Sequence, residues 1–462
     1  MIVGNSAQGT HGRDSEAGHN ILLEGTMGDT LKSQPVFTRL QRIAEMAASD
    51  PKKVFISLAH LIDVDFLREA HHLTRKDSAP GYDKVTADEY AVGLEANLEN
   101  LYQRIKTGTY RAPPVERTWI QKEDGKQRPI GKPTFEDKIL QRAVVMLMNS
   151  IYEQDFFSFS HGFRPGHSQH MALHELREQC HNLKITWVID ADVSGCFDNI
   201  SHGKLQEIIR QRVNDGGLLR LIGKWLHAGV LEKGIISYPD KGTQQGGVAS
   251  PLLANIFLHH ILDEWFVRDV KPRMTGRCFL IRWADDFVIG FENESDARRV
   301  MEVLPKRFGK FELTIHPVKT RLISFRPPTQ RTGKGKGENT FDFLGFTHYW
   351  GKSLKGNWAI MRKTAQKRMR RAKKAIWTWC RDNRHEPLAR QHETLVSKLR
   401  GHFQYYAVRK NSRCLHDMRE FIRHAWKYWL SRRSGRSWIP WENYEKILKE
   451  FPFPQPRIIH YI

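Results

Sequence analysis

The chain has 462 residues, enough for two to four domains of roughly 100–200 residues each and for a well-buried core. Hydrophobic residues make up 40% of it and charged residues 27%, which is typical of a soluble globular protein. No apolar stretch approaches the roughly 18 residues that cross a bilayer, and residues 1–35 lack the basic start and apolar block of a secretory signal. The composition argues against a membrane partner and predicts a cytoplasmic protein of bacterial type.

Positive charge is concentrated near the C-terminus. Lys and Arg outnumber Asp and Glu by 73 to 51 in the whole chain, and residues 351–462 alone hold 27 Lys and Arg against 8 Asp and Glu. Seven of the 13 Trp also lie there. A near-neutral body followed by a basic, aromatic-rich region predicts a catalytic core joined to a nucleic-acid-binding part. The five cysteines form no C-x-x-C pair, which argues against a zinc ribbon or a disulfide framework.

The first third of the chain is predicted to be mainly helical. Residues 1–36 are rich in Gly, Ser and Asn without an apolar period, and we expect them to be disordered. Apolar residues at helical spacing predict helices over 38–62, 94–105 and 139–151. Residues 117–133 alternate between apolar and polar around a turn and predict a basic hairpin.

An alternation of strands and helices follows. The expected elements are a strand at 185–192, a helix at 252–266, a hairpin of strands at 279–283 and 287–291, a strand pair within 341–349, and helices at 361–380, 391–408 and 415–432.

Carboxylates end two of these predicted strands. Asp190 and Asp192 close the first strand, and Asp285 and Asp286 lie at the tip of the hairpin. An Asp-Asp pair at a turn is often ordinary turn chemistry, but an Asp beside an apolar strand is costly unless it is paired or binds a cation. Two strands that each deliver carboxylates suit two Mg²⁺ ions, which prefer few carboxylates plus phosphate oxygens. The pattern predicts phosphoryl transfer of the polymerase or nuclease kind.

Short motifs along the chain resemble those of the group II intron-encoded reverse transcriptase/maturase family, and they occur in family order from about residue 37 to residue 462. They are S-A-P-G-Y-D at 78–83, R-P-I-G-K-P at 128–133, D-V-S-G-C-F-D at 192–198, Q-G-G-V-A-S-P at 245–251, W-A-D-D at 283–286, P-V-K-T at 317–320, F-L-G-F at 343–346 and L-R-G-H-F-Q-Y-Y at 399–406.

This chain departs from the family pattern at several positions. Trp283 stands where the family usually has Tyr or Phe, which bears on fidelity. Lys132 and Cys196 are also unusual for their blocks. The sequence ends without the Cys/His cluster of a DNA endonuclease, so the resemblance is to the class that lacks this domain, and we expect no bottom-strand cleavage.

The resemblance implies an α+β fold, that of a right-hand polymerase with fingers and palm, followed by an all-helical thumb or maturase domain. The implied divisions are a disordered segment at 1–36, an N-terminal extension and fingers at 37–180, a palm at 181–350, a helical thumb at 351–432 and a short basic DNA- or RNA-binding tail at 433–462.

The resemblance also implies roles for individual residues. Asp192, Asp285 and Asp286 would hold two Mg²⁺ ions, with help from the carbonyl of Val193 and with Mn²⁺ as a substitute, whereas Asp190 would not be a ligand. Phe197 would exclude the 2′-hydroxyl of a ribonucleotide. The implied nucleotide-binding residues are Lys122, Arg128, Phe197, Gln245, Gly246 and Lys319. The implied RNA-binding residues, expected on a basic helix face and in the thumb signature, are Arg362, Lys363, Lys367, Arg368, Arg370, Arg371 and Arg400.

The implied activity is cDNA synthesis from dNTPs on an RNA template with a DNA primer, together with assistance to the splicing and mobility of a structured intron RNA. Target DNA is a further implied partner, which would associate the protein with the nucleoid. Two alternatives stay open. One is a domesticated reverse transcriptase that serves defence or DNA repair, and the other is a maturase that only binds RNA.

Overall fold

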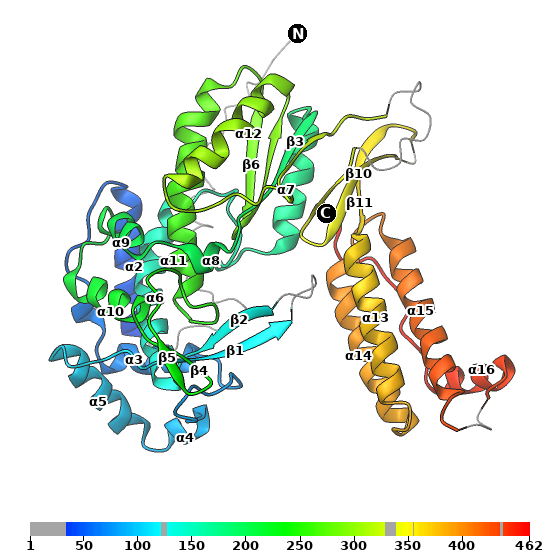
Figure 1. The fold of residues 1–462 in the computed structure, drawn as a ribbon, viewed down its shortest axis with the longest axis horizontal. Helices are drawn as coiled ribbons and strands as arrows, with labels where there is room; N and C mark the ends of the chain where they lie inside the picture. The colour runs from blue at the N-terminus through cyan, green and yellow to red at the C-terminus, as the bar shows by residue number, and fades with distance from the viewer. Residues whose placement is uncertain (1–33, 122–126, 329–338, 354, 435–437) are drawn as a thin grey trace, which may run out of the picture.

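The computed structural model describes residues 34–121, 127–328, 339–353, 355–434 and 438–462. An N-terminal body, coloured blue to green, lies beside a C-terminal region of one small sheet and several helices, coloured yellow to red (Figure 1). The content of helices and strands confirms the predicted α+β class. Within the described ranges, none of the helices is both long and apolar enough to cross a membrane.

Helices make up most of the N-terminal body. They are α2 (Gln34–Ser49), α3 (Val64–Leu73), α4 (Ala87–Ala91), α5 (Leu94–Lys106), α6 (Phe135–Asp155), α7 (Gln169–Asn182), α8 (Cys196–Asn199), α9 (His202–Arg210), α10 (Gly216–Leu226), α11 (Ser250–Leu258) and α12 (Glu294–Gly309). After α11 the helix continues in wider π-type turns, η2 (His259–Asp263) and η3 (Phe266–Val270).

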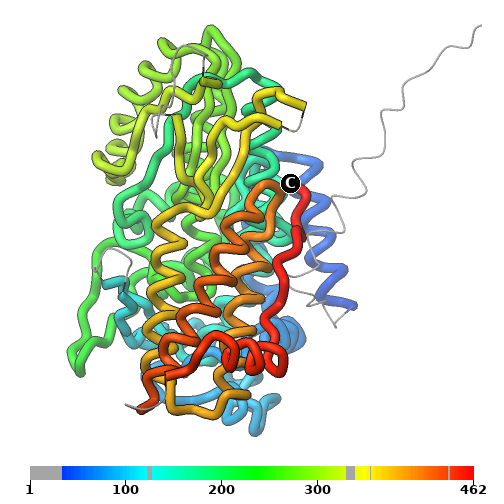
Figure 2. Tube along the Cα trace, turned by 90° about the vertical axis from the view of Figure 1, so that its right-hand side faces the viewer, coloured from blue at the N-terminus to red at the C-terminus, as the bar shows by residue number. Residues whose placement is uncertain are grey.

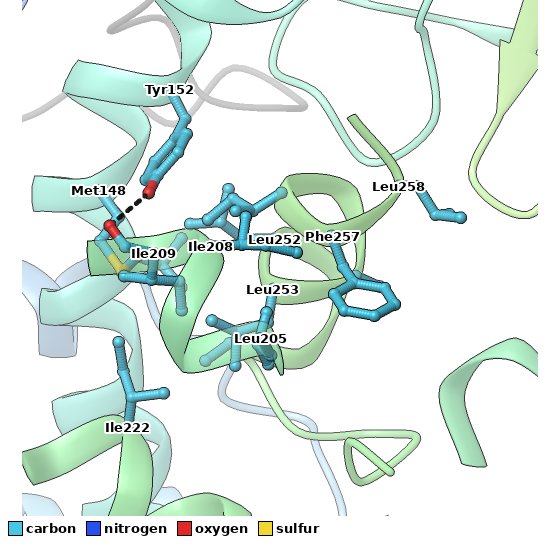
Figure 3. Packing of buried hydrophobic residues seen from close by; sticks show 14 of the residues in the cluster. Met148, Tyr152, Leu205, Ile208, Ile209, Ile222, Leu252, Leu253, Phe257 and Leu258 are labelled. Carbon is cyan, nitrogen blue, oxygen red and sulfur yellow. Dashed lines mark hydrogen bonds between the residues drawn. The ribbon is translucent and has the colours of Figure 1, made fainter. Parts of the chain in front are cut away.

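Helix α6 lies at the centre of this body, because it packs against α2 and α3 and is largely buried. It begins at a cap in which the hydroxyl of Thr134 accepts a hydrogen bond from the backbone N–H of Asp137. Figure 3 shows how its side chains meet those of α9 and α11, where the hydroxyl of Tyr152 donates to the carbonyl of Ile209 at 3.4 Å. The other labelled members of this cluster are Met148, Leu205, Ile208, Ile222, Leu252, Leu253, Phe257 and Leu258.

The start of the chain differs from the prediction at two boundaries. The helix expected over 38–62 ends at Ser49, since Asp50 precedes Pro51 and a residue before proline disfavours the helical conformation. Helix α2 begins at Gln34, so residues 34–36 are helical rather than disordered. The rest of the predicted disordered segment lies outside the described residues.

A four-stranded antiparallel sheet carries the predicted carboxylates. Its order is β6 (Cys278–Trp283), β7 (Asp286–Phe291), β3 (Trp187–Asp192) and β8 (Arg321–Ser324). Because side chains alternate along a strand, the sheet has two buried faces. Val188 lies in the same buried cluster as Leu173 of α7, whereas Ile189 lies in the cluster that contains Val300 of α12. The two helices therefore cover opposite faces of the sheet.

The predicted basic hairpin forms the edge of a second sheet. Its strands are β1 (Val115–Gln121) and β2 (Gln127–Lys132), and the sheet continues through β4 (Val230–Glu232) to β5 (Ile235–Ser237). The turn predicted between β1 and β2 lies outside the described residues.

The C-terminal region begins with a third sheet, in the order β11 (Trp358–Thr364), β10 (Phe346–Lys352) and β9 (Phe341–Phe343). It continues with α13 (Gln366–Asp382), α14 (Leu388–Tyr406), α15 (Ser412–Leu430) and α16 (Trp441–Glu450). The predicted helix start at residue 361 is wrong, because β11 pairs with β10 up to Thr364 and the helix begins only at Gln366.

The last residues pack against the helical region. Tyr444 of α16 is fully buried, and Phe453 joins the same hydrophobic cluster as Leu399 of α14. From there the chain runs back along the helices (Figure 2). The backbone N–H groups of Ile459 and His460 both donate to the carbonyl of Ala407. Packing of these apolar residues therefore joins the predicted basic tail to the helical region.

Candidate active site

Three of the predicted carboxylates meet where the central sheet ends. In the antiparallel register of β3 and β7, Asp192 lies directly opposite Asp286. Side chains directly opposite one another in such a pair have Cβ atoms about 4.5–5.5 Å apart. Asp285 precedes Asp286 in the turn from β6 to β7. Asp190 lies two residues before Asp192 and therefore on the same face of the sheet.

The carboxylates repel one another electrostatically. Burial raises the pKa of Asp286 well above its usual value, and the charges of Asp190, Asp285 and Asp192 raise it further. Burial also raises the pKa of Asp285, with an additional contribution from Asp192. The site is therefore a partly buried concentration of negative charge that requires compensating cations.

Two cationic side chains supply part of this compensation. The Nζ atom of Lys319 lies 2.8 Å from Oδ2 of Asp192, and a guanidinium nitrogen of Arg321 lies 2.8 Å from Oδ2 of Asp190. Arg368 of α13 lowers the pKa of Asp286, opposing the effect of burial. The helical region thus contributes positive charge to the field at the sheet end.

The donor set fits magnesium better than a softer metal. Among the described residues, no group of three or more His, Cys, Asp or Glu side chains forms a complete metal cage. Mg²⁺ does not require such a cage, since it is commonly held by one or two carboxylates together with water and substrate phosphates. Asp192 and Asp286 from neighbouring strands, with Asp285 beside them, offer carboxylate oxygens of this kind.

The turn that carries Asp285 has an unusual backbone. Ala284 has a φ of 55°, in the left-handed region that costs a residue with a Cβ atom about 1–2 kcal/mol. The preceding Trp283 pairs with Asp286 across the turn and packs against the cluster between α7 and the sheet. The surroundings must therefore hold this turn in place.

Two of the predicted nucleotide-binding residues, Gln245 and Arg128, are in direct contact. The Oε1 atom of Gln245 accepts a hydrogen bond from Nε of Arg128 at 2.8 Å, and Nε2 of Gln245 donates to Oδ1 of Asp198 at 3.2 Å. The backbone N–H of Gly131 donates to the carbonyl of Gln245 at 2.6 Å. Gly246 has a φ of 109°, and a Cβ atom there would lie 2.4 Å from the carbonyl oxygen of Gly131. Only glycine fits this close approach.

Phe197 borders the same region. The residue is 9% exposed, its carbonyl accepts a hydrogen bond from the backbone N–H of Thr243 at 2.7 Å, and its ring meets Phe163 edge-on with the ring centroids 6.3 Å apart. An open cavity extends from here along the face of β1, lined among others by Arg117, Gly131, Asp198 and Gln245. Lys122 lies outside the described residues.

Two of the seven predicted RNA-binding residues lie on a strand rather than on a helix. Arg362 is 2% exposed, and its guanidinium donates to the carbonyl of Leu173 in α7 at 2.9 Å. The expectation that Arg362 contacts RNA is therefore wrong, because this side chain is used inside the protein. Lys363 is its exposed neighbour on β11. The exposed members on helices are Lys367, Arg368, Arg370 and Arg371 of α13, and Arg400 of α14.

Sequence reasoning missed the segment before α7. The backbone of Phe159 and His161 bonds to both sides of Arg282 in β6, so this segment lies beside the hairpin that carries Asp285. A Cβ atom at Gly162 would lie 2.3 Å from the backbone nitrogen of Ala284. The segment is too short for a strand or helix to be predicted from its apolar residues, and the available signal is its glycines and proline between two helices.

Comparison with known proteins identifies this arrangement. Residues 120–348 match the family described as Reverse transcriptase (RNA-dependent DNA polymerase). The matched region includes the central sheet, Gln245 and Phe197, so it is an RNA-directed DNA polymerase domain.

The relatives define the family more closely. The chain is 36% identical to Protein YkfC of Escherichia coli (strain K12) over 289 residues, which cover 55% of this chain and 75% of that protein. It is 38% identical to Group II intron-encoded protein LtrA of Lactococcus lactis subsp. cremoris over 245 residues, which are 52% of this chain and 40% of LtrA. It is 29% identical to Nuclear intron maturase 1, mitochondrial, of Arabidopsis thaliana over 91 residues, 20% of this chain and 12% of that protein. The chain belongs to the group II intron reverse transcriptase/maturase family.

Proposed function

We propose that this protein synthesises cDNA on an RNA template by two-Mg²⁺ phosphoryl transfer. The observation that carries the proposal is the register that sets Asp192 opposite Asp286, with Asp285 in the adjoining turn. In this proposal residues 37–180 form the N-terminal extension and fingers, and residues 181–350 form the palm. The thumb then extends from residue 351 to the end, since α16 and the segment after it pack on α14 and α15.

The three aspartates, with the carbonyl of Val193, would hold two Mg²⁺ ions or Mn²⁺ in their place. Such ions, when bound, stabilise the attacking and leaving oxygens of a phosphoryl transfer. Arg128 offers a guanidinium for the triphosphate, and its bond to Gln245 orients it toward the site. Lys319 sits beside Asp192, where its ammonium would reach the departing pyrophosphate.

Phe197 would discriminate between sugars. Its backbone is fixed by Thr243 and its ring by Phe163, so the ring cannot easily move aside for an added 2′-hydroxyl. The 2′-hydroxyl is the group by which a protein distinguishes RNA from DNA. Gly246 would let the loop that carries Gln245 approach Gly131 closely beside the nucleotide or template.

The second proposed activity is binding of a structured intron RNA to assist its splicing. The exposed cations of α13 offer contacts for the phosphates of an RNA backbone, and they are Lys367, Arg368, Arg370, Arg371, Lys374 and Arg381. The proteins LtrA and Nuclear intron maturase 1 carry intron function in their names, which favours this role over one in defence or repair.

Primer extension tests the polymerase. We expect the protein to extend a DNA primer annealed to RNA, and the double variant Asp285→Asn/Asp286→Asn to lose this activity while keeping its RNA affinity. Asp88→Asn, at an exposed position of α4, serves as the control and should match the wild type. Extension that persists in the double variant would contradict the proposal.

Sequencing of the RNA that co-purifies from native cells tests the partner. A single structured RNA whose ends are splice sites around this reading frame supports the maturase role. A small RNA of another kind, or a mixed pool, would instead support a domesticated reverse transcriptase.

A further inference from the structure

A fully buried ion pair lies next to the turn that carries Asp285. Arg282 and Asp263 have no exposed side-chain surface, and the guanidinium binds the carboxylate through two bonds, Nε to Oδ1 at 2.8 Å and a terminal nitrogen to Oδ2 at 2.6 Å. Burying such a pair costs desolvation, and exchange for apolar residues is often neutral or stabilising. The pair therefore contributes little to the stability of the fold, and its role is better judged from its contacts with the neighbouring turn.

The remaining guanidinium nitrogen of Arg282 binds the turn itself. It donates to the carbonyl of Ala284 at 3.1 Å and to Oδ1 of Asn255 at 3.0 Å. Asn255, on α11, donates in turn to the carbonyl of Gly162 at 2.6 Å. Gly162 lies against the backbone nitrogen of Ala284. One side chain thus ties α11 and the segment before α7 to the turn between β6 and β7.

These contacts act on a backbone conformation that needs support. Ala284 has a positive φ, and such conformations persist where the surrounding structure over-determines them. Its two neighbours on the C-terminal side are Asp285 and Asp286. A rotation of this peptide would move both carboxylates relative to Asp192, which stands on a separate strand.

We propose that Arg282 is a positioning residue, which fixes the carbonyl of Ala284 and thereby holds Asp285 and Asp286 in the arrangement that binds the catalytic cations. Asp263 and Asn255 hold the guanidinium for this task. The inference rests on the proposed polymerase function. The positioning role requires the forked, planar guanidinium of arginine, because the single ammonium of a lysine cannot meet Asp263, Asn255 and Ala284 in the same geometry.

The chain offers a matched control for a purely structural role. Arg212 pairs with Asp155 through Nε at 2.9 Å, with side chains 8% and 18% exposed. Its terminal nitrogens donate to the carbonyls of Ala47, Asp50 and Lys53, which anchor the end of α2. This arginine has the same kind of partners as Arg282 and no contact with the carboxylate turn.

The experiment compares Arg282→Lys with Arg212→Lys in the full-length protein. Three readouts are needed: the melting temperature, Mn²⁺ binding followed by electron paramagnetic resonance, and the Mg²⁺ dependence of primer extension. We expect both variants to melt at lower temperature than the wild type. Only Arg282→Lys should bind Mn²⁺ at least fivefold more weakly and need correspondingly more Mg²⁺ for half-maximal rate, with an unchanged KM for the primer–template.

Equal cation binding in Arg282→Lys and Arg212→Lys would overturn the inference and leave Arg282 as a structural residue. Asn255→Ala keeps the ion pair with Asp263 but removes the link to Gly162, and it should weaken Mn²⁺ binding in the same direction. If Arg282→Lys does not fold, Asn255→Ala tests the inference in its place. Mn²⁺ binding by Asn255→Ala as strong as that of the wild type would then count against the inference. A wild-type protein without Mn²⁺ binding or primer extension would instead contradict the proposed function.

Discussion

Lys319 and Asp192 form an ion pair of 2.8 Å at the open end of the central sheet, although one lies on a loop after α12 and the other on β3. Two further contacts hold the loop there. The backbone N–H of His316 donates to the carbonyl of Asp192 at 2.8 Å, and the backbone N–H of Asp192 donates to the hydroxyl of Thr320 at 3.4 Å. The position of Lys319 is therefore fixed by its backbone, and its ammonium is available for chemistry beside the carboxylate.

Replacement of Lys319 by Ala should separate catalysis from stability. The lysine side chain is 58% exposed, and exposed ion pairs contribute only about 0–1 kcal/mol to folding. We therefore expect a melting temperature close to that of the wild type. Loss of a proton donor beside the site should slow single-turnover nucleotide addition by about 10²-fold. Lys319→Arg keeps the positive charge and the ion pair with Asp192, and it serves as the control for the charge. An equal rate of nucleotide addition in the wild type and in Lys319→Ala would exclude a role of Lys319 in the chemistry.

Phe197→Val should relax sugar selection. Replacing the phenyl ring by the smaller valine side chain opens space beside the sugar. A steric difference of this size corresponds to about 10–100-fold in the discrimination between deoxyribonucleotides and ribonucleotides. We expect ribonucleotide incorporation to rise by that factor relative to dNTP incorporation, measured as the ratio of kcat/KM values. Phe197→Tyr keeps the ring and should retain wild-type selection. If Phe197→Val rejects ribonucleotides as well as the wild type does, the gate lies elsewhere.

Gly246→Ala should disable the enzyme without unfolding it. The new Cβ atom would lie 2.4 Å from the carbonyl oxygen of Gly131, and the backbone has a positive φ that disfavours alanine. The loop that carries Gln245 must shift, so we expect kcat/KM for dNTPs to fall by at least about tenfold, in line with the loss of one positioned contact. Gly203→Ala on α9 is the control, because nothing lies within 4 Å of its added Cβ atom.

Sequence reasoning placed the proposed catalytic carboxylates at strand ends because their signal is local. Asp192 and Asp286 each adjoin an apolar strand, and the alternation of apolar residues predicts where the strand ends. The contact between them depends on the antiparallel pairing of β3 with β7, two strands far apart in the sequence, and the hairpin motif predicts only the pairing of β6 with β7. Elements with a strong period, such as the hairpin of β6 and β7 and helix α5, were likewise predicted within one or two residues.

Long-range partners could not be predicted in this way. Arg362 looks like one more cation in a basic run, and only the packing of β11 against α7 reveals that Leu173 takes its guanidinium. The partner of Arg282, Asp263, lies in the π-type turns after α11, and the helical period predicted over 252–266 does not show that its carboxylate meets β6. Charge counts also do not reveal how the C-terminal residues pack, since their apolar members, including Tyr444, join the core of the helical region.

The exposed cations of α13 should control the salt dependence of RNA binding. We expect the triple variant Lys367→Gln/Arg370→Gln/Lys374→Gln to reduce the slope of log affinity against log salt concentration by about 2–3, since each phosphate contact contributes about 0.7–0.9. All three side chains are exposed, so folding should be unaffected.

A control triple variant on α12 and the residue that follows it carries the same change in charge, namely Arg299→Gln/Lys306→Gln/Lys310→Gln. These side chains are exposed as well, and α12 covers the face of the sheet opposite to α7. An equal loss of slope in both triple variants would mean that net charge alone, rather than the face of α13, sets the affinity.

His348 should make stability depend on pH. The ring is fully buried and stacks on Phe341 at 4.9 Å, and burial, aided by the charge of Arg362, lowers the pKa of His348 to about 3. In the unfolded chain the same ring takes up a proton near pH 6.5. Between these two values the unfolded state binds more protons than the folded state, so the free energy of unfolding falls as the pH falls. At pH 5 this loss amounts to about 2 kcal/mol relative to pH 8.

His348→Phe keeps the stacked ring and removes the proton site. We compare the free energy of unfolding of His348→Phe with that of the wild type, as obtained from urea midpoints. This difference should favour His348→Phe by about 2 kcal/mol more at pH 5 than at pH 8. His416→Phe, at an exposed position of α15, is the control and should show the same difference from the wild type at both pH values. A difference for His348→Phe that does not change between pH 8 and pH 5 would mean that the folded protein accepts a proton at this ring, and that the contact between β10 and β9 opens to allow it.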